Sequence, residues 1–190
     1  MRRSTAGAVL VVVTAAGLLS QCRLLPQDEG VLVQVDGRPV DVAGRLLGLW
    51  QQTVRYCGDV TVLANGSPRW RAAQRALAGY SPPASLAVRP VQMLAWGDGA
   101  WLLVELRWDV PGQALDPAIV PLLRQGVSPA GHVGQGGDSH YQVQPAGVWS
   151  GDTGPWFAPV FIRRFLAQRV PALPAALRQC LDPQGPPFNR

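Results

Sequence analysis

Valine alternates with other residues in two short runs near the start of the chain, at positions 31–35 and 38–42, and Asp36-Gly37 lies between the runs. Alternation with a period of two is typical of half-buried β-strands. Asp-Gly is a favoured pair for a two-residue type I′ turn. The pattern predicts a β-hairpin in which five valines share one face: Val31, Val33, Val35, Val40 and Val42.

After this hairpin the apolar residues recur at helical intervals, and the pattern predicts a helix. Asp41 is placed to cap a helix, and Gly58 is placed to end one. The apolar residues between them recur every three or four positions, so we expect the helix to bury them in the core. They are Leu46, Leu49, Trp50, Val54 and Cys57. A short strand over 60–63 and a second helix from Ser67 to Gly79 come next.

A second hairpin is predicted over residues 91–108, with its turn at Asp98-Gly99. The preferred register places Trp96 opposite Trp101 and gives the hairpin one apolar and one polar face. The apolar face carries Val91, Met93, Ala95, Leu102, Val104 and Leu106. The polar face carries Gln92, Trp96, Trp101, Glu105 and Arg107.

The second half of the chain mixes helix and strand signals. Asp116 and Pro117 are typical of a helix start, and they predict a short helix that ends at Gly126. A glycine-rich loop follows over 126–139. We then expect a strand over 140–149 that is broken at Pro145, a helix over 156–170 and a last helix over 173–181.

These elements predict an α+β fold, with two β-hairpins and further short strands in a mainly antiparallel sheet packed by four to five helices. The chain has 190 residues, which is enough for one ordinary domain. We expect this domain to occupy residues 30–182, followed by a C-terminal tail over 183–190.

Composition narrows the chemistry. All 17 basic residues are arginine, so the chain contains no lysine. Walker A phosphate loops and Schiff-base enzymes are excluded because each needs a lysine, and we expect no cofactor. The formal net charge of +5 is not gathered into a basic stripe with interleaved aromatic residues, so we do not expect nucleic-acid binding.

The first 22 residues carry an export pattern. Arg2 and Arg3 precede an apolar run, Gly7–Leu19, which is shorter than the ~20 residues that a membrane-spanning helix needs. This pattern predicts a signal peptide over 1–21; an uncleaved anchor or a core helix is the alternative. The run ends in Leu19-Ser20-Gln21-Cys22, which resembles the lipobox of bacterial exported lipoproteins, where the cysteine receives a diacylglycerol and becomes the mature N-terminus.

This resemblance implies a protein that is anchored on the extracytoplasmic side of a membrane by a lipid on Cys22. Gln21 stands where the family has Gly, Ala or Ser. A secretory cleavage near residues 15–17 is therefore an open alternative, and it would leave a soluble periplasmic or secreted protein. We expect residues 22–29 to form a short tether between the lipid and the domain.

The chain has three cysteines, Cys22, Cys57 and Cys180. In an oxidising compartment an odd cysteine needs an explanation. A lipid on Cys22 leaves the other two as a pair, and we predict a Cys57–Cys180 disulfide. Two buried free thiols are the alternative.

Candidate catalytic residues are few. The two histidines, His132 and His140, bracket the glycine-rich loop together with Asp138. A nucleophilic triad needs a histidine, so an extracytoplasmic hydrolase would have to use this loop. The same residues lack a fourth ligand for a metal ion, and we expect no metal site. We therefore expect binding rather than catalysis.

The tryptophans indicate where binding takes place. Trp96 and Trp101 would lie beside Glu105 and Arg107 on the polar face of the second hairpin. Flat rings beside carboxylate and guanidinium groups suit a carbohydrate or a protein partner; packing beneath a covering helix is the alternative. Residues 35–41 also resemble the hairpin that leads into a helix in exported parvulin-type chaperones, which leaves a chaperone-like factor as a further alternative.

Overall fold

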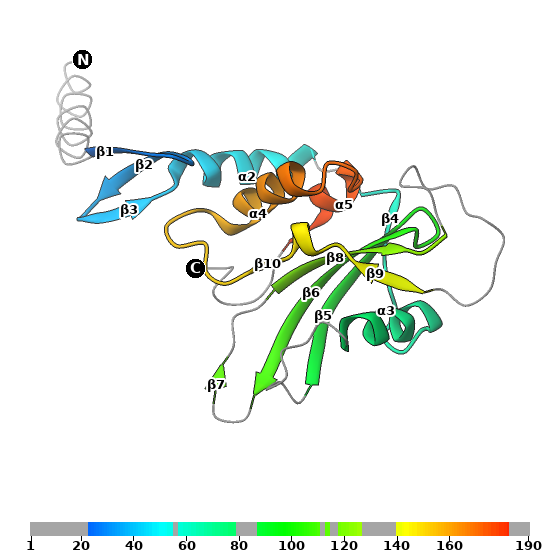
Figure 1. Ribbon diagram of the computed structural model, residues 1–190. Helices are drawn as coiled ribbons and strands as arrows, with labels where there is room; N and C mark the ends of the chain where they lie inside the picture. Colours follow the sequence, from blue (N-terminus) through cyan, green and yellow to red (C-terminus); the bar gives the residue numbers. More distant parts are fainter. Residues whose placement is uncertain are drawn as a thin grey trace, which may run out of the picture.

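The computed structural model shows a chain that folds into two β-sheets and several helices (Figure 1). The residues that it describes are 23–54, 57–78, 87–110, 113–114, 118–126 and 140–182. Every strand pair among them is antiparallel. Four α-helices accompany the strands in these ranges. The predicted α+β class is confirmed.

The smaller sheet has the order β1-β2-β3. β2 (Gly30–Val35) and β3 (Arg38–Val40) form the predicted first hairpin. Both of its turn residues, Asp36 and Gly37, have positive φ angles, as a type I′ turn requires. β3 is shorter than predicted, so Val42 belongs to the following helix and not to the face of the hairpin.

The residues directly before the hairpin form a strand rather than a tether. β1 (Arg23–Gln27) pairs with β2 along its whole length. Pro26 is tolerated because β1 is an edge strand. The tether predicted over 22–29 is therefore wrong for these residues, since the strand satisfies the backbone groups of β2 that would otherwise lie on a free edge.

The first helix, α2 (Val42–Val54), begins at the predicted cap: the Asp41 carboxylate accepts a hydrogen bond from the N–H of Gly44 at 2.7 Å. The prediction that the five apolar residues over 46–57 belong to the core is wrong for the four that lie in α2, whereas Cys57 packs against the core. The helix packs inward through its buried glycines instead, and it leaves the apolar residues outside. Four of them are between 55% and 62% exposed: Leu46, Leu49, Trp50 and Val54.

The larger sheet has the order β10-β8-β6-β5-β4. Its centre is the predicted second hairpin, formed by β5 (Ala87–Trp96) and β6 (Trp101–Val110). The register is the predicted one, since the two tryptophans that flank the turn lie opposite each other. The predicted apolar face is buried, except that an irregularity between Pro90 and Gln92 leaves Val91 exposed.

A strand stands in place of the helix predicted over 117–126. β8 (Ala118–Arg124) pairs with β6, and successive residues belong to the cores on opposite sides of the sheet. The helix prediction is wrong because a short apolar run that is buried on both sides lacks the alternation of a half-buried strand. Pro121 is tolerated because it lies between the residues that pair with β9 (Tyr141–Val143) and those that pair with β10 (Trp149–Ser150).

Two short strands complete the sheet, and a turn of 3-10 helix interrupts its edge. The predicted break at Pro145 is confirmed as a turn of 3-10 helix, η1 (Pro145–Gly147), between β9 and β10. β4 (Val60–Val62) pairs with the end of β5, close to the predicted bounds. β7 (Gln113–Ala114) pairs with the end of β6.

Helices cover both faces of the larger sheet (Figure 1). α3 (Pro68–Ala78) begins at the predicted Ser67 cap and packs on one face. α4 (Ala158–Arg169) and α5 (Ala175–Cys180) pack on the other face, and α2 lies on the outer side of α4. Both helices predicted near the C-terminus are thus confirmed, with shorter bounds.

Candidate functional site

Most of the polar face predicted for the second hairpin is not a surface. Trp101 and Glu105 are each only 1% exposed, and Arg107 is half-buried. α4 and α5 cover this face, and Trp101 is part of the core that they form with the sheet. The predicted binding surface is therefore wrong for Trp101 and Glu105, because a strand in the middle of a sheet with helices on both sides is buried on both faces.

Trp96 differs from these neighbours because it lies at the end of β5, beside the turn. Its half-buried side chain packs against the core and also lines a hollow of about 530 Å³. The volume is in the range of small-molecule sites in proteins. The rest of the lining comes from β4 and the two residues before it, from α3, from Ala95 of β5 and from the β5–β6 turn. Its polar side chains are Asp59, Thr61, Arg69 and Asp98.

The β5–β6 turn forms one wall of this hollow, and neighbouring side chains fix its backbone. Gly97, Asp98 and Gly99 all have positive φ angles, which glycine adopts without strain. Tyr141 Oη donates a hydrogen bond to the carbonyl of Gly99 at 2.8 Å, and Arg124 donates one to the carbonyl of Asp98 at 3.3 Å. The Asp98 carboxylate therefore projects from a backbone that is held in place.

Two arginines lie around the inner end of this turn. A Cβ atom on Gly99 would lie 3.1 Å from Cδ of Arg69, so this arginine packs directly over the turn. Burial raises the pKa of the Tyr141 phenol, while the positive charges of Arg124 and Arg69 act in the opposite direction. The Arg69 side chain therefore packs against the turn and also lines the hollow.

The hollow combines one flat ring with charged groups of both signs. Trp96 supplies the ring, Arg69 a guanidinium, and Asp59 and Asp98 two exposed carboxylates. An indole can stack on the apolar face of a sugar ring, while the charged groups donate to and accept from its hydroxyls. Among the described residues that line the hollow there is no histidine or cysteine that could act as a base or nucleophile.

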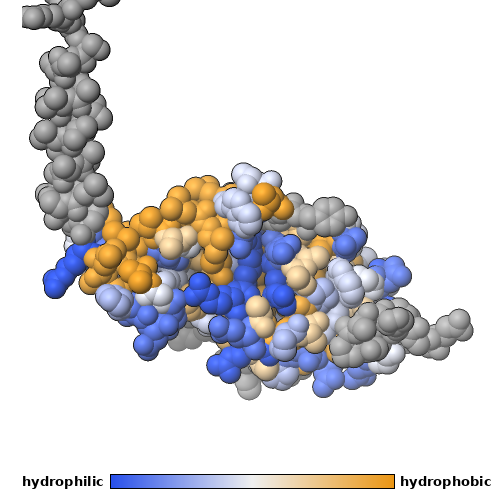
Figure 2. All heavy atoms as spheres, turned by 90° about the horizontal axis from the view of Figure 1, so that it is seen from above, coloured by the Kyte–Doolittle hydropathy of each residue, from blue (hydrophilic) through white to orange (hydrophobic). Residues whose placement is uncertain are grey.

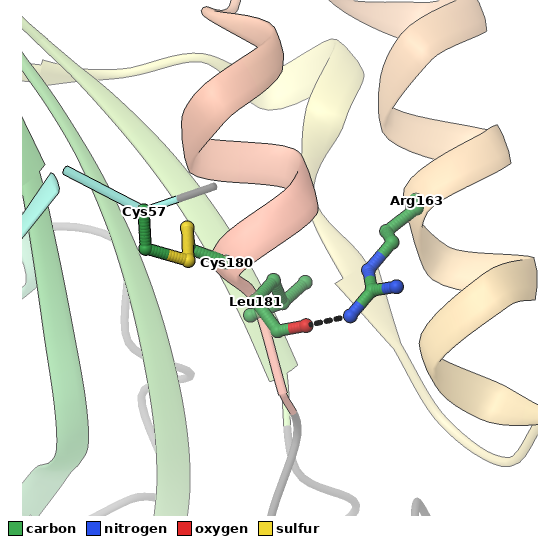
Figure 3. Close-up of a disulfide and its surroundings, with 4 residues drawn as sticks. All are labelled: Cys57, Arg163, Cys180 and Leu181. Carbon is green, nitrogen blue, oxygen red and sulfur yellow. Dashed lines mark hydrogen bonds between the residues drawn. A yellow bond between two sulfur atoms is a disulfide. The ribbon is translucent and has the colours of Figure 1, made fainter. Parts of the chain in front are cut away.

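A disulfide secures the segment that leads into the hollow (Figure 3). Cys57 and Cys180 are bonded, with their Cα atoms 5.7 Å apart, which confirms the predicted pairing. The bridge joins the end of α5 to the residue before Gly58, which lines the hollow. The two cysteines are 123 residues apart, and loop-entropy reasoning assigns about 4–5 kcal/mol to a bridge of that span. Beside it, Arg163 of α4 donates to the carbonyl of Leu181 at 2.6 Å.

A second hollow of about 110 Å³ lies between the β1–β2 turn, α2 and α4. Asp41 in its wall is fully engaged, since its Oδ2 accepts the N–H of Phe157 at 3.0 Å in addition to the cap of α2. Arg164 donates to the carbonyl of Glu29 at 2.7 Å. These contacts join the small sheet and α2 to the start of α4, so this hollow is a packing junction. The sequence carries no local signal for the contact with Phe157, which is 116 residues away.

The alternative histidine site lies mostly outside the structure. His140 is exposed directly before β9. His132 and Asp138 lie outside the described residues, as does Cys22 with the predicted signal peptide. Over the ranges that the structure does describe, no three side chains among His, Cys, Asp and Glu come together in the way that a metal ion would need.

Within the described part of the chain, no helix has both the length and the apolar character needed to cross a membrane.

Comparison with known proteins adds no assignment to this site. No protein-family model matches the chain, and no curated protein and no solved structure matches it.

Proposed function

We propose that this chain is an exported binding domain, anchored to a membrane by a lipid on Cys22, that holds a carbohydrate in the hollow beside Trp96. Its work is binding rather than catalysis. The proposal joins the sequence pattern of residues 1–22 with the geometry of the hollow.

The disulfide supports export. Disulfides persist outside the reducing cytoplasm, and Cys57 and Cys180 form one here. This pairing leaves Cys22 as the odd cysteine of three, as a lipobox cysteine would be. Cys22 also stands directly before β1, so a mature chain that begins at Cys22 keeps every strand and helix of the described fold.

The hollow beside Trp96 is the observation that carries the binding function. Its aromatic wall, Trp96, lies at the end of β5, which is an interior strand of the larger sheet, and the turn beside it is held by Tyr141 and Arg124. A site on fixed elements loses little conformational freedom when a ligand binds. One guanidinium and two carboxylates supply donors and acceptors for a neutral molecule with many hydroxyls, which favours a sugar.

A titration with a soluble N-acetylglucosamine tetramer tests this function. We expect the NMR signal of the Trp96 indole N–H to shift in a saturable way. Trp96→Ala and Arg69→Ala should each weaken binding about tenfold, which corresponds to ~1.4 kcal/mol and is the size of a lost stacking or charge-assisted contact. Trp50→Ala is the matched control because this tryptophan is 61% exposed on α2, outside the hollow, and it should bind like the unchanged protein.

Two results would contradict this function. The first is saturable binding that Trp96→Ala leaves unchanged, or no binding at all. The second is cleavage of the tetramer during the titration, which would make the protein a hydrolase. Recovery of the intact tetramer, with the far-ultraviolet circular dichroism of the variants unchanged, supports a binding site.

A further inference from the structure

We infer that the outer face of α2, defined by Leu46, Leu49, Trp50 and Val54, rests in the surface of the bilayer that holds the lipid of Cys22. This inference depends on the proposed lipid anchor. It adds an orientation: the domain meets the membrane through one helix and the edge of the small sheet, rather than hanging from a flexible tether.

The apolar side of α2 faces away from the protein, which is the reverse of an ordinary surface helix. A helix on a globular domain normally buries its apolar stripe and exposes its polar residues. The inward side of α2 instead carries Gly44, Gly48 and Gln51. A Cβ atom on Gly48 would lie 2.3 Å from Cε1 of Phe157, so α2 lies too close to the start of α4 for a side chain at this position.

The apolar surface extends beyond α2. The four residues of the α2 outer face are 55–62% exposed, and Leu24 of β1 is 67% exposed. Figure 2 shows apolar surface from the β1–β2 hairpin along α2. Arg45 is the one charged residue of α2, and its guanidinium lies 5.9 Å from the centre of the Phe157 ring. A continuous apolar region of this kind marks an interaction surface.

The proposed lipid site, Cys22, is close in sequence to the exposed edge of the small sheet. Leu24 is two residues after Cys22, a span of about 7 Å in an extended chain. β1 is paired with β2 along its whole length, so the predicted tether is absent from residues 23–27. A lipid on Cys22 would therefore hold this edge of the domain at the lipid headgroups, which is where an apolar face can enter the interface.

The chemistry of the face fits the interface of a bilayer. Leucine and valine side chains are stabilised when they leave water for the acyl boundary of a bilayer. Tryptophan is enriched at this depth because its ring is amphipathic. Arg23 carries a positive charge at the start of β1, where it can meet lipid phosphates. In this orientation α4 lies between the bilayer and the larger sheet.

A fluorescent probe on the α2 outer face tests this inference. The full lipidated chain, purified from membranes, is reconstituted into vesicles of phosphatidylethanolamine and phosphatidylglycerol. An environment-sensitive probe is attached to Leu49→Cys or, as the matched control, to Val91→Cys. Val91 is an exposed apolar residue of β5 on the larger sheet. The engineered thiol is the only free one, because Cys57 and Cys180 are bonded and the lipid occupies Cys22.

The inference predicts that the Leu49 probe is quenched by nitroxide-bearing lipid and is several-fold less accessible to aqueous iodide than the Val91 probe. Adding Leu46→Glu, one helical turn away, should return the Leu49 probe to water. If both probes are equally open to iodide while the mass of the protein shows a lipid on Cys22, the anchor stands and the inference is overturned.

Two other outcomes also decide the matter. Protection of the Leu49 probe that rises with protein concentration, without quenching by the nitroxide lipid, would overturn the inference in favour of a second copy of this chain. An unmodified Cys22 would remove the proposed anchor, and the inference would fall with it. The mass of Cys22 therefore separates failure of the proposed function from failure of the membrane contact.

Discussion

Tyr141 is a single buried side chain that makes the stability of the fold depend on pH. Its hydroxyl donates to the carbonyl of Gly99, and the residue is 6% exposed. Burial raises the phenol pKa above its ordinary value of 10.0, against the opposing charges of Arg124 and Arg69. The folded state therefore keeps the phenol proton to a higher pH than the unfolded chain does.

The contribution of this phenol to the free energy of unfolding should consequently be fully present below about pH 10 and should fall as the pH rises through that value, because the unfolded chain loses this proton first. Tyr141→Phe should remove this contribution to the pH dependence. It should also cost about 1 kcal/mol near neutral pH through the lost hydrogen bond. Urea unfolding of both proteins from about pH 8 to about pH 10.5 measures the difference, and the absence of lysine leaves few other groups to titrate in that window. Parallel curves for the two proteins would contradict this account.

Some roles of single residues could be predicted from the sequence, and others could not. Asp41 and Ser67 cap their helices as predicted, because capping depends only on the residues within one turn. The second hydrogen bond of Asp41, to Phe157, joins parts of the chain that the fold alone brings together. Trp96 was predicted as a binding residue and does line a hollow, but its partners Asp59 and Arg69 carry no signal that links them to it.

At the scale of elements, α2 shows the limit of periodicity. The spacing of its apolar residues correctly predicts a helix, because period and cap are local properties. It cannot tell which side faces the protein. Gly48 decides this, since it allows close contact with Phe157 at the start of α4 only on its own side of the helix. β8 shows a related limit, because an apolar run that is buried on both sides looks the same as a buried helix.

The contact between α2 and α4 can be tested at Gly48. Alanine is preferred to glycine inside a helix by about 0.8–1.0 kcal/mol, so Gly48→Ala would stabilise a free helix. In this protein the new Cβ atom would meet the Phe157 ring at 2.3 Å. We expect a net loss of about 1 kcal/mol or more in the free energy of unfolding, because overpacking costs roughly 1–3 kcal/mol.

The same substitution in a Phe157→Ala background is the matched control. Without the ring the clash is absent, and Gly48→Ala should then be neutral or stabilising. Urea unfolding of the four proteins in this double-mutant cycle shows whether the sign reverses. A stabilising Gly48→Ala in the unchanged background would mean that α2 does not pack against Phe157 through this glycine.

At the scale of the whole molecule, the two hairpins could be predicted from the sequence, but which helices cover each face of the larger sheet could not. The register of β5 and β6 follows from the turn and the alternation, and it is correct. The alternation also suggested a polar outer face, yet α4 and α5 cover that face and bury Trp101 and Glu105. Which helices cover a sheet depends on contacts between distant segments, and a single sequence does not reveal them. The disulfide could be predicted because three cysteines leave few ways to pair.

The central proposal also concerns the whole molecule: the domain lies outside the cytoplasm, and a lipid on Cys22 anchors it to a membrane. The most direct test is the intact mass of the protein purified from the membranes of a bacterial host. The account predicts a chain that begins at Cys22, carries a diacylglycerol there and has Cys57 and Cys180 oxidised to a disulfide. A chain that begins near residues 15–18, or that retains residue 1, with an unmodified Cys22 would contradict it.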